Sequence, residues 1–386
     1  MTMEVLADWV SKVSNVVWNG LLLYLLVGTG IVFTIRTRFV QVRKFGAGWK
    51  HLFGHFSLNG EKAGKDGMSP FQALTTAIAA QVGTGNIAGA ATALYSGGPG
   101  AIFWMWLSAF FGMSTIYGEA VLAQKYKTTD DKGHVTGGPI YYIRARFTGK
   151  FGKFLAGFFS VAIIFALGFT GNMVQANSIS VAFNTAFGAP MIVVGIICAI
   201  IAAFIFLGGV GRIAAVTEKV VPIMALFYMG GAVVVLWVHR ANLPQAFAQI
   251  CSMAFDTRAG TGGVLGYGMT QAVRAGVARG IFSNEAGLGS SVMVHAAADA
   301  REPCEQGMWA VFEVFFDTIV MCSVTAFVIL TSGVYDVSRY ALASGTPLLS
   351  QLTTGAQLTA EAFSTVFGRF GGGFVAVSLA LFAFST

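Results

Sequence analysis

A polar stretch inside an apolar run of small residues could bind a small charged solute. The run spans residues 73–93 and carries no charged residue, and its centre reads Gln81-Val82-Gly83-Thr84-Gly85-Asn86. Glycine is a poor helix former, and threonine and asparagine offer the backbone competing hydrogen bonds. A helix interrupted here exposes carbonyl groups that can hold a cation. It also exposes amide groups, at the positive end of the next helix, that can hold a carboxylate. We therefore predict a site at this break, with Gln81 among its residues.

A second stretch mixes glycine with polar residues in the same way. Residues 280–291 read Gly280-Ile281-Phe282-Ser283-Asn284-Glu285-Ala286-Gly287-Leu288-Gly289-Ser290-Ser291. Two interrupted spans at corresponding positions of two halves are typical of secondary transporters, whose substrate sites form between them. Ser283 and Asn284 are predicted to contact the solute, and Glu285 to form a structural ion pair with Arg279.

Other polar residues in apolar surroundings allow two interpretations each. Asn172 and Gln175 are three residues apart and share a helix face, so they either contact the solute or bond a neighbouring helix. Glu119, Glu313 and Asp317 either belong to a gate or pair helices. Polar groups at membrane depth are costly, and for this reason they face the protein interior.

Three competing readings of these motifs are disfavoured. Gly83-x-Gly85-x-x-Ala88 matches a dinucleotide fingerprint, but no acidic residue follows at about 20 positions. Ser290 and His295 could suggest a hydrolase, yet no acid occupies a matching position to orient the base. A passive channel would need a continuous polar path, whereas the polar residues gather at two breaks. We expect a protein that is not an enzyme.

Composition indicates a multi-pass membrane protein. Of 386 residues, 55% are hydrophobic and 11% charged, against about 25% charged in soluble domains. The four cysteines are scattered and suggest neither a metal site nor a redox centre. We expect an all-α fold. Nine candidate spans are Val16–Ile35, Phe71–Tyr95, Ile102–Gln124, Phe154–Phe183, Met191–Leu207, Ile213–Val238, Met269–Ala298, Trp309–Thr331 and Phe374–Thr386.

The connections between these spans predict the orientation. Seven Lys and Arg residues lie in residues 36–65 and seven more in residues 125–153. Both connections can face one side, which the positive-inside rule makes the cytoplasm. The net charge of +7 is therefore a topology signal and not evidence for nucleic acid binding. Residues 239–267 are expected to be a loop, and residues 332–369 a loop with room for a short helix. The last run, residues 374–386, is short for a span of about 30 Å, so we expect further spans after it.

Motifs along the whole chain resemble those of the alanine or glycine:cation symporter family. They are residues 67–74, Gln81 to Asn86, Gly97-Gly98-Pro99-Gly100-Ala101 with Phe103-Trp104-Met105-Trp106, Gly137-Gly138-Pro139, and Ser283 to Gly289. The resemblance implies the inverted five-helix-repeat transporter fold of sodium symporters. Residues 1–70 would then be an extra N-terminal helix with a basic loop, residues 71–240 the first repeat, and residues 241–386 an incomplete second repeat.

The resemblance also implies ligands for each solute. The Gly83-Thr84-Gly85-Asn86 turn would bind an amino acid carboxylate, with the Thr84 and Gly85 amides as donors. Sodium would be held by two carbonyl groups of the first broken helix and by one carbonyl and two hydroxyls of a later helix. The residues at those positions are Ala79, Val82, Phe382, Ser385 and Thr386. Oxygen ligands without a carboxylate suit a monovalent cation better than calcium.

Taken with the resemblance, the sequence predicts sodium-coupled symport of a small neutral amino acid, alanine or glycine, by alternating access. The protein is expected in the plasma (inner) membrane, with its N-terminus extracytoplasmic and the lipid bilayer as its surroundings. The residues by themselves allow either sodium or a proton as the coupling ion. They also allow alanine, glycine or serine, in either D or L form.

Overall fold

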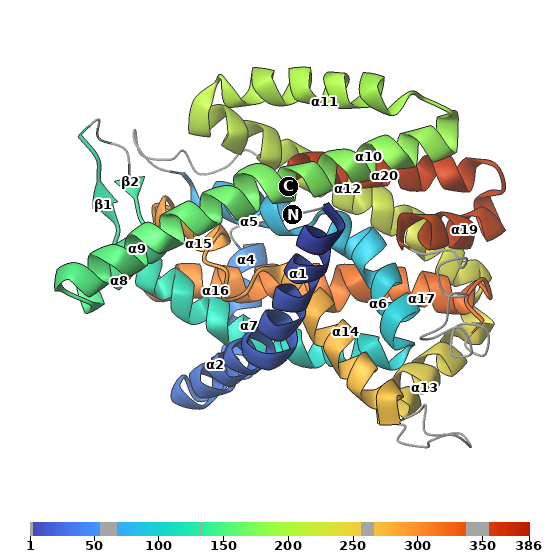
Figure 1. The fold of residues 1–386 in the computed structure, drawn as a ribbon, viewed down its shortest axis with the longest axis horizontal. Coiled ribbons are helices and arrows are strands. Elements are labelled where there is room, and N and C mark those ends of the chain that lie inside the picture. The colour runs from blue at the N-terminus through green and yellow to red at the C-terminus, as the bar shows by residue number, and fades with distance from the viewer. Residues whose placement is uncertain (1–2, 55–67, 132, 134, 256–265, 337–354) are drawn as a thin grey trace.

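The chain folds almost entirely into helices in a computed structural model (Figure 1). The structure describes residues 3–54, 68–131, 133, 135–255, 266–336 and 355–386. Within these ranges the strands β1 (Thr128–Thr129) and β2 (Val135–Thr136) form one short antiparallel pair, with Thr128 opposite Thr136. The prediction of an all-α fold is confirmed.

The first half of the chain contains the outer helices and the first broken helix. Its helical elements are α1 (Met3–Val16), η1 (Val17–Leu22), α2 (Leu23–Arg36), α3 (Val40–Arg43), α4 (Phe45–Gly54), α5 (Pro70–Gln81), η2 (Gly85–Gly89), α6 (Ala90–Gly97), α7 (Gly100–Lys125), α8 (Pro139–Arg146), α9 (Gly149–Ile163), η3 (Ile164–Gly171) and α10 (Asn172–Phe187).

The second half adds the second broken helix and the helices that pack around both. Its helical elements are α11 (Met191–Phe206), α12 (Gly209–Val238), η4 (Arg240–Asn242), α13 (Leu243–Met253), α14 (Gly266–Asn284), α15 (Ser291–Ala296), α16 (Pro303–Val314), η5 (Phe315–Cys322), α17 (Ser323–Thr331), α19 (Gly355–Phe367) and α20 (Phe370–Ser385).

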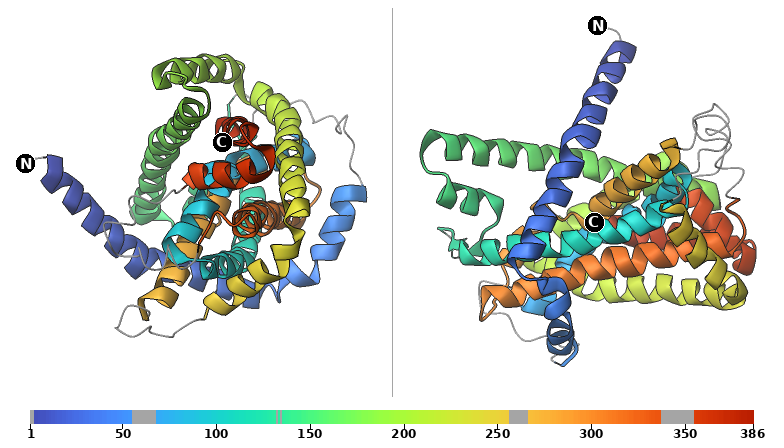
Figure 2. Two further views of the ribbon diagram at one scale, coloured as in Figure 1. Left: turned by 90° about the vertical axis from the view of Figure 1, so that its right-hand side faces the viewer. Right: turned by 90° about the horizontal axis from the view of Figure 1, so that it is seen from below.

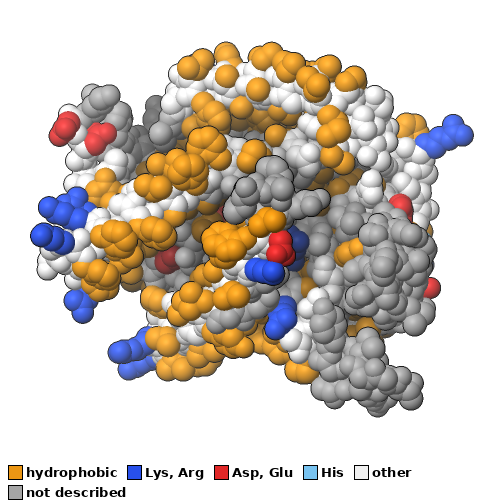
Figure 3. Space-filling model, in the orientation of Figure 1, with side chains coloured by type: hydrophobic (Ala, Val, Ile, Leu, Met, Phe, Trp, Pro, Cys, Tyr) orange, Lys and Arg blue, Asp and Glu red, His pale blue; other side chains and the backbone are white. Residues whose placement is uncertain are grey.

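Four of the described helices are long and apolar enough to cross a membrane, by length and composition. They are Gly100–Lys125, Gly149–Phe187, Gly211–Val238 and Pro303–Thr331. Two of them, Gly149–Phe187 and Gly211–Val238, expose many large apolar side chains, such as Phe154, which is 68% exposed. The shorter apolar helix α11 does the same, with Ile192 78% exposed. Figure 3 shows hydrophobic side chains spread over one face of the molecule. A surface of this kind is stable in lipid and unfavourable in water, so the protein is a multi-pass membrane protein.

The first predicted break is present at the expected residues. Helix α5 begins with a capping box, in which Ser69 accepts from the Gln72 amide and Gln72 from the Ser69 amide, and it ends at Gln81. Val82 and Gly83 are not helical, and the helix resumes at Thr84 and continues as the π-helical segment η2 and then α6. Most residues of this broken helix are buried, and it lies in the middle of the bundle (Figure 2).

The second predicted break is also present. Helix α14 ends at Asn284 and α15 begins at Ser291, with a turn of non-helical residues between them. The turn uses left-handed backbone conformations, with φ of 52° at Glu285, 92° at Gly287 and 82° at Gly289. Only glycine adopts such values at little cost, which explains the two glycines of the motif.

The connections hold more helix than predicted. Helix α13 lies in residues 239–267, which were expected to be a loop, and its amphipathic sequence packs Ala246 and Ile250 into the core. Helix α19 lies within residues 332–369, which were expected to be a loop that could contain a short helix. The predicted span 154–183 is longer than expected, because α9, η3 and α10 run on as one helix from Gly149 to Phe187.

Candidate functional site

The two breaks lie side by side in the interior. The Asn86 side chain of the first break is 3.4 Å from Ser283 Oγ at the end of α14. A Cβ atom added to Gly85 would stand 3.2 Å from Ser283 Oγ, so the absence of a side chain lets the two backbones approach. This contact agrees with the prediction that a site forms between the two breaks.

Asp317 of the π-helical segment η5 connects both breaks. Its Oδ1 accepts from Asn86 Nδ2 at 2.7 Å and from Ser283 Oγ at 3.1 Å, while Thr318 Oγ1 donates to Oδ2 at 2.7 Å. Asp317 is fully buried. The sequence allows two roles for Asp317, in a gate or in pairing helices. The sequence signal for either role is a carboxylate in the middle of an apolar span. Placing a charged group there costs free energy, so such residues pair with other polar groups or take part in function.

Side chains hold the amide groups of the first break. The Gly83 amide donates to Asn86 Oδ1 at 3.0 Å, and the Thr84 amide donates to Gln175 Oε1 at 3.4 Å. Gln175 therefore lies at the break, where it would have to lie in order to contact the solute. A carboxylate bound by the Thr84 amide would replace the amide oxygen of Gln175.

Gln81 is buried at the end of α5 with an unsatisfied side chain. It is 3% exposed, and neither Oε1 nor Nε2 has a hydrogen-bond partner within the described part of the chain. Buried polar atoms are normally paired, so the unpaired amide beside a helix break keeps Gln81 as a candidate for contact with a ligand.

The two remaining polar candidates are placed differently. Asn172 lies on an exposed face of α10 and donates to the Gly168 carbonyl of its own helix at 3.1 Å, so the structure does not bring it to the break. Asn284 is fully buried, donates to Thr318 Oγ1 at 3.2 Å and accepts from the Ala286 amide at 3.1 Å. Asn284 therefore shapes the second break.

The end of α20, which carries three of the five residues expected to hold a cation, lies against the first break. Thr386 Oγ1 is the nearest atom to the position that a Gly83 Cβ would occupy, which places this hydroxyl against the first break. Ser385 and Thr386 donate to the Phe382 carbonyl at 2.8 and 3.0 Å. Because the Gly83 amide bonds Asn86 instead of continuing the helix, it does not take up the Ala79 carbonyl.

This donor set fits a monovalent cation. Ala79 and Val82 are buried at the end of α5, with Val82 at its non-helical C-cap, and Phe382 is buried on α20. The predicted ligands are carbonyl and hydroxyl oxygens, which are hard ligands without charge. In the described ranges, no cluster of three or more His, Cys, Asp or Glu residues could hold a metal ion.

The acids of the second break have partners that the sequence did not indicate. Glu119 of α7 accepts from the Gly287 amide at 3.0 Å. Glu285 accepts a hydrogen bond from Ser290. The predicted ion pair between Glu285 and Arg279 is wrong: among the described residues no salt bridge joins them, and the Arg279 guanidinium lies 5.9 Å from the ring centroid of Phe282. The left-handed turn at Glu285 directs its carboxylate to Ser290.

Two facing helix breaks inside a bundle of membrane helices define a polytopic membrane transporter. The chain matches the model of the sodium:alanine symporter family over residues 3–386, and it belongs to that family. It is therefore an amino acid:cation symporter and not an enzyme.

The similar proteins include transporters from bacteria and archaea. The chain is 42% identical over 383 residues to the sodium/alanine symporter AgcS of Methanococcus maripaludis, covering 98% of this chain and 81% of that protein. It is 39% identical over 381 residues to the probable sodium/glutamine symporter GlnT of Bacillus subtilis, covering 99% and 74%. It is 38% identical over 374 residues to the amino-acid carrier protein AlsT of Bacillus subtilis, covering 97% and 74%.

Proposed function

We propose that the protein carries alanine or glycine together with sodium by alternating access. The observation that carries the proposal is the contact between the two helix breaks, with the unpaired Gln81 amide beside it. The name of the relative AgcS, a sodium/alanine symporter, supports the pairing of these two solutes.

The site suits a substrate with a small side chain. The carboxylate would take the Thr84 and Gly85 amides, with Gln81, Gly83, Asn86 and Gln175 around it and Ser283 and Asn284 on the opposite break. The segments that surround the substrate are rich in small residues, namely Ala79, Ala80, Gly83, Gly85, Ala88 and Gly287. The glutamine named in the relative GlnT has a much larger side chain, which these residues fit less well.

Sodium would bind on the other side of the same break. Its ligands would be the carbonyls of Ala79, Val82 and Phe382 and the hydroxyls of Ser385 and Thr386. Cation and carboxylate then stabilise one helix break from its two ends. Coupling follows if the protein can close with both solutes bound but not with only one. Each ligand shifts the equilibrium between the open and closed states by the difference in its affinity for those two states.

Proteoliposome uptake tests this function. Labelled alanine should accumulate when an inward sodium gradient is imposed, and it should exchange with unlabelled alanine inside, which a passive channel does not permit. Uptake that follows a proton gradient equally well without sodium would favour the proton-coupled alternative. Accumulation of labelled glutamine in preference to alanine and glycine would contradict the proposed substrate.

A further inference from the structure

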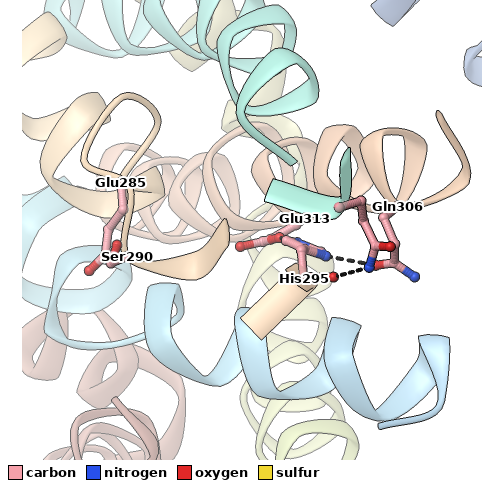
Figure 4. A network of polar contacts seen from close by, with 6 residues as sticks. Glu285, Ser290, His295, Gln306 and Glu313 are labelled. Atoms are coloured by element: carbon pink, nitrogen blue, oxygen red, sulfur yellow. Dashed lines mark hydrogen bonds and ion pairs between the residues drawn. The ribbon is translucent and has the colours of Figure 1, made fainter. Parts of the chain in front are cut away.

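A buried polar cluster that the proposed transport function does not use lies on the second broken helix (Figure 4). His295 of α15 is placed between two side chains of α16. Its Nδ1 is 2.8 Å from Gln306 Oε1, and its Nε2 is 2.6 Å from Glu313 Oε2. All three residues are 0% exposed. Gln306 and Glu313 are two helical turns apart on one face of α16, and the imidazole ring fills the distance between them.

The hydrogen bonds of this cluster require a proton. Gln306 Oε1 accepts only, and so does an ionised Glu313, so both atoms facing the ring need a donor. A neutral imidazole has one donor nitrogen and one acceptor nitrogen. Two arrangements satisfy both contacts: an imidazolium beside a carboxylate, or a neutral imidazole beside a protonated Glu313. With the Gln306 amide in this orientation, both arrangements hold one proton more than a neutral imidazole beside an ionised Glu313.

The same side chains can also satisfy the proton-free state. Gln306 Nε2 and Glu313 Oε1 are buried and have no hydrogen-bond partner within the described ranges. Turning the Gln306 amide by half a rotation would place its NH2 group at Nδ1, and the ring would then donate from Nε2 to the ionised Glu313. The two states differ by one proton and one amide rotation. A purely structural ion pair would need only the state that contains the proton.

We propose that His295, Gln306 and Glu313 form a proton-binding site, and that the bound proton holds α15 against α16. The C-terminal end of α15 is fixed on its other side: Gln124 donates to the carbonyls of His295 and Ala298 at 2.5 and 2.9 Å, and Lys127 Nζ donates to Ala298 at 3.0 Å. Loss of the proton leaves one uncompensated negative charge in a dry interior, which weakens the packing of this short half-helix.

The other ionisable groups near the cluster have partners of their own. Glu119 of α7 bonds the Gly287 amide, Glu285 bonds Ser290, and Asp317 of η5 bonds Asn86, Ser283 and Thr318. Figure 4 shows the pair of Glu285 and Ser290 well apart from the cluster.

The helices packed against α15 and α16 add few other charges. Helix α5 contributes no ionisable residue, and α4 contributes Lys50, which is exposed, while the side chain of His51 lies outside the described part. On α7, Tyr117 packs at Gly307, and Lys125 lies at the end of the helix. On α16 itself, Glu305 lies in the first turn and Cys304 is exposed. Among the described residues, Glu313 is the acidic side chain that contacts His295.

Stability against pH, measured without any amino acid, tests the site directly. Only the folded cluster holds this proton in place, so the unfolding temperature of the wild type in detergent should fall by a few degrees as pH rises above neutrality. Glu313→Gln supplies an amide donor to Nε2, as the protonated acid does. It should keep the low-pH unfolding temperature and lose this slope. Glu302→Gln, the same change at an exposed position before α16, should keep the wild-type slope.

A second variant covers the case in which Glu313→Gln does not fold. Gln306→Glu adds an acceptor and a negative charge beside Nδ1, so it should favour the proton and move the midpoint to higher pH. An unchanged midpoint in Gln306→Glu, or a wild-type slope in Glu313→Gln, would overturn the proposed proton site. Sodium-driven alanine uptake provides the separate readout: in the wild type it should decline as pH rises above neutrality, and in Glu313→Gln it should not. Absence of alanine uptake in the wild type would count against the proposed substrate, while the stability data still decide the proton site.

Discussion

Single residues at the two breaks show why small and polar side chains occur at membrane depth. Gly85 has no side chain where Ser283 approaches, and Asn86 uses its whole amide: Oδ1 accepts from Gly83 and Nδ2 donates to Asp317. Each unpaired backbone or side-chain group would otherwise cost about 1–3 kcal/mol in a buried position. The non-helical backbone is tolerated because it is enclosed in protein, away from lipid.

At this scale we predict that Gly85→Leu abolishes transport while the protein still inserts. A leucine Cβ would start 3.2 Å from Ser283 Oγ, and the rest of the side chain has no room between the breaks. Forcing it in costs about 1–3 kcal/mol and separates the two breaks. The measurement is alanine uptake together with the amount of protein in the membrane.

The matched control for this variant is Gly195→Leu on α11. An added Cβ there meets no atom within 4 Å, and Gly195 is partly exposed, so uptake should stay near the wild-type value. Normal transport by Gly85→Leu would show that the breaks do not form the site.

At the scale of elements, the end of α20 decides where a cation can bind. Phe382, Ser385 and Thr386 lie within one helical turn, and the position of α20 brings this turn against the first break. Ser385 also donates to Met224 Sδ at 3.4 Å on α12, which fixes the turn from its other side. The candidate sodium site is thus shared between an unwound helix end and the last turn of a regular helix.

We expect Ser385→Ala combined with Thr386→Ala to raise the sodium concentration needed for half-maximal uptake by about tenfold or more. Removing an uncharged oxygen ligand from a cation costs about as much as losing a hydrogen bond to a charged group, about 1.5–3 kcal/mol. Uptake measured over a sodium series gives the value. Ser160→Ala on α9, whose hydroxyl bonds the Ala156 carbonyl of its own helix, serves as the control. An unchanged sodium dependence in the double variant would place the cation elsewhere.

At the scale of the whole molecule, the first broken helix is enclosed, and some of the continuous helices face outward. The helix Gly149–Phe187 and α11 expose large apolar residues, whereas α5, α6 and η5 are buried. In Figure 2 the N-terminal helix α1 projects away from the bundle, whereas α2 packs against α7. This arrangement protects the unwound backbone from lipid and leaves apolar surface for the bilayer to cover.

The predicted orientation can be measured at the same scale. In a cysteine-free background, Asp8→Cys on α1 should react with an impermeant maleimide added outside intact cells, and Lys150→Cys on α9 should react only after permeabilisation. Both positions are exposed, so access depends on the side of the membrane. The reason is the excess of Lys and Arg in residues 125–153, which favours the cytoplasm. The reverse labelling pattern would refute an extracytoplasmic N-terminus.

The sequence determined the class of protein, the membrane helices and both helix breaks. These features are local: apolar runs form helices in lipid, and glycine with asparagine or threonine lowers the stability of the helix at those residues. The tertiary structure decided which polar residues meet. It selected Gln175 over Asn172, two residues on one predicted face, because only Gln175 reaches the Thr84 amide. It also paired Asp317 with Asn86 across 231 positions and Glu285 with Ser290. Which polar residues become hydrogen-bond partners depends on how the helices pack in three dimensions. The spacing of residues along the chain does not contain that information.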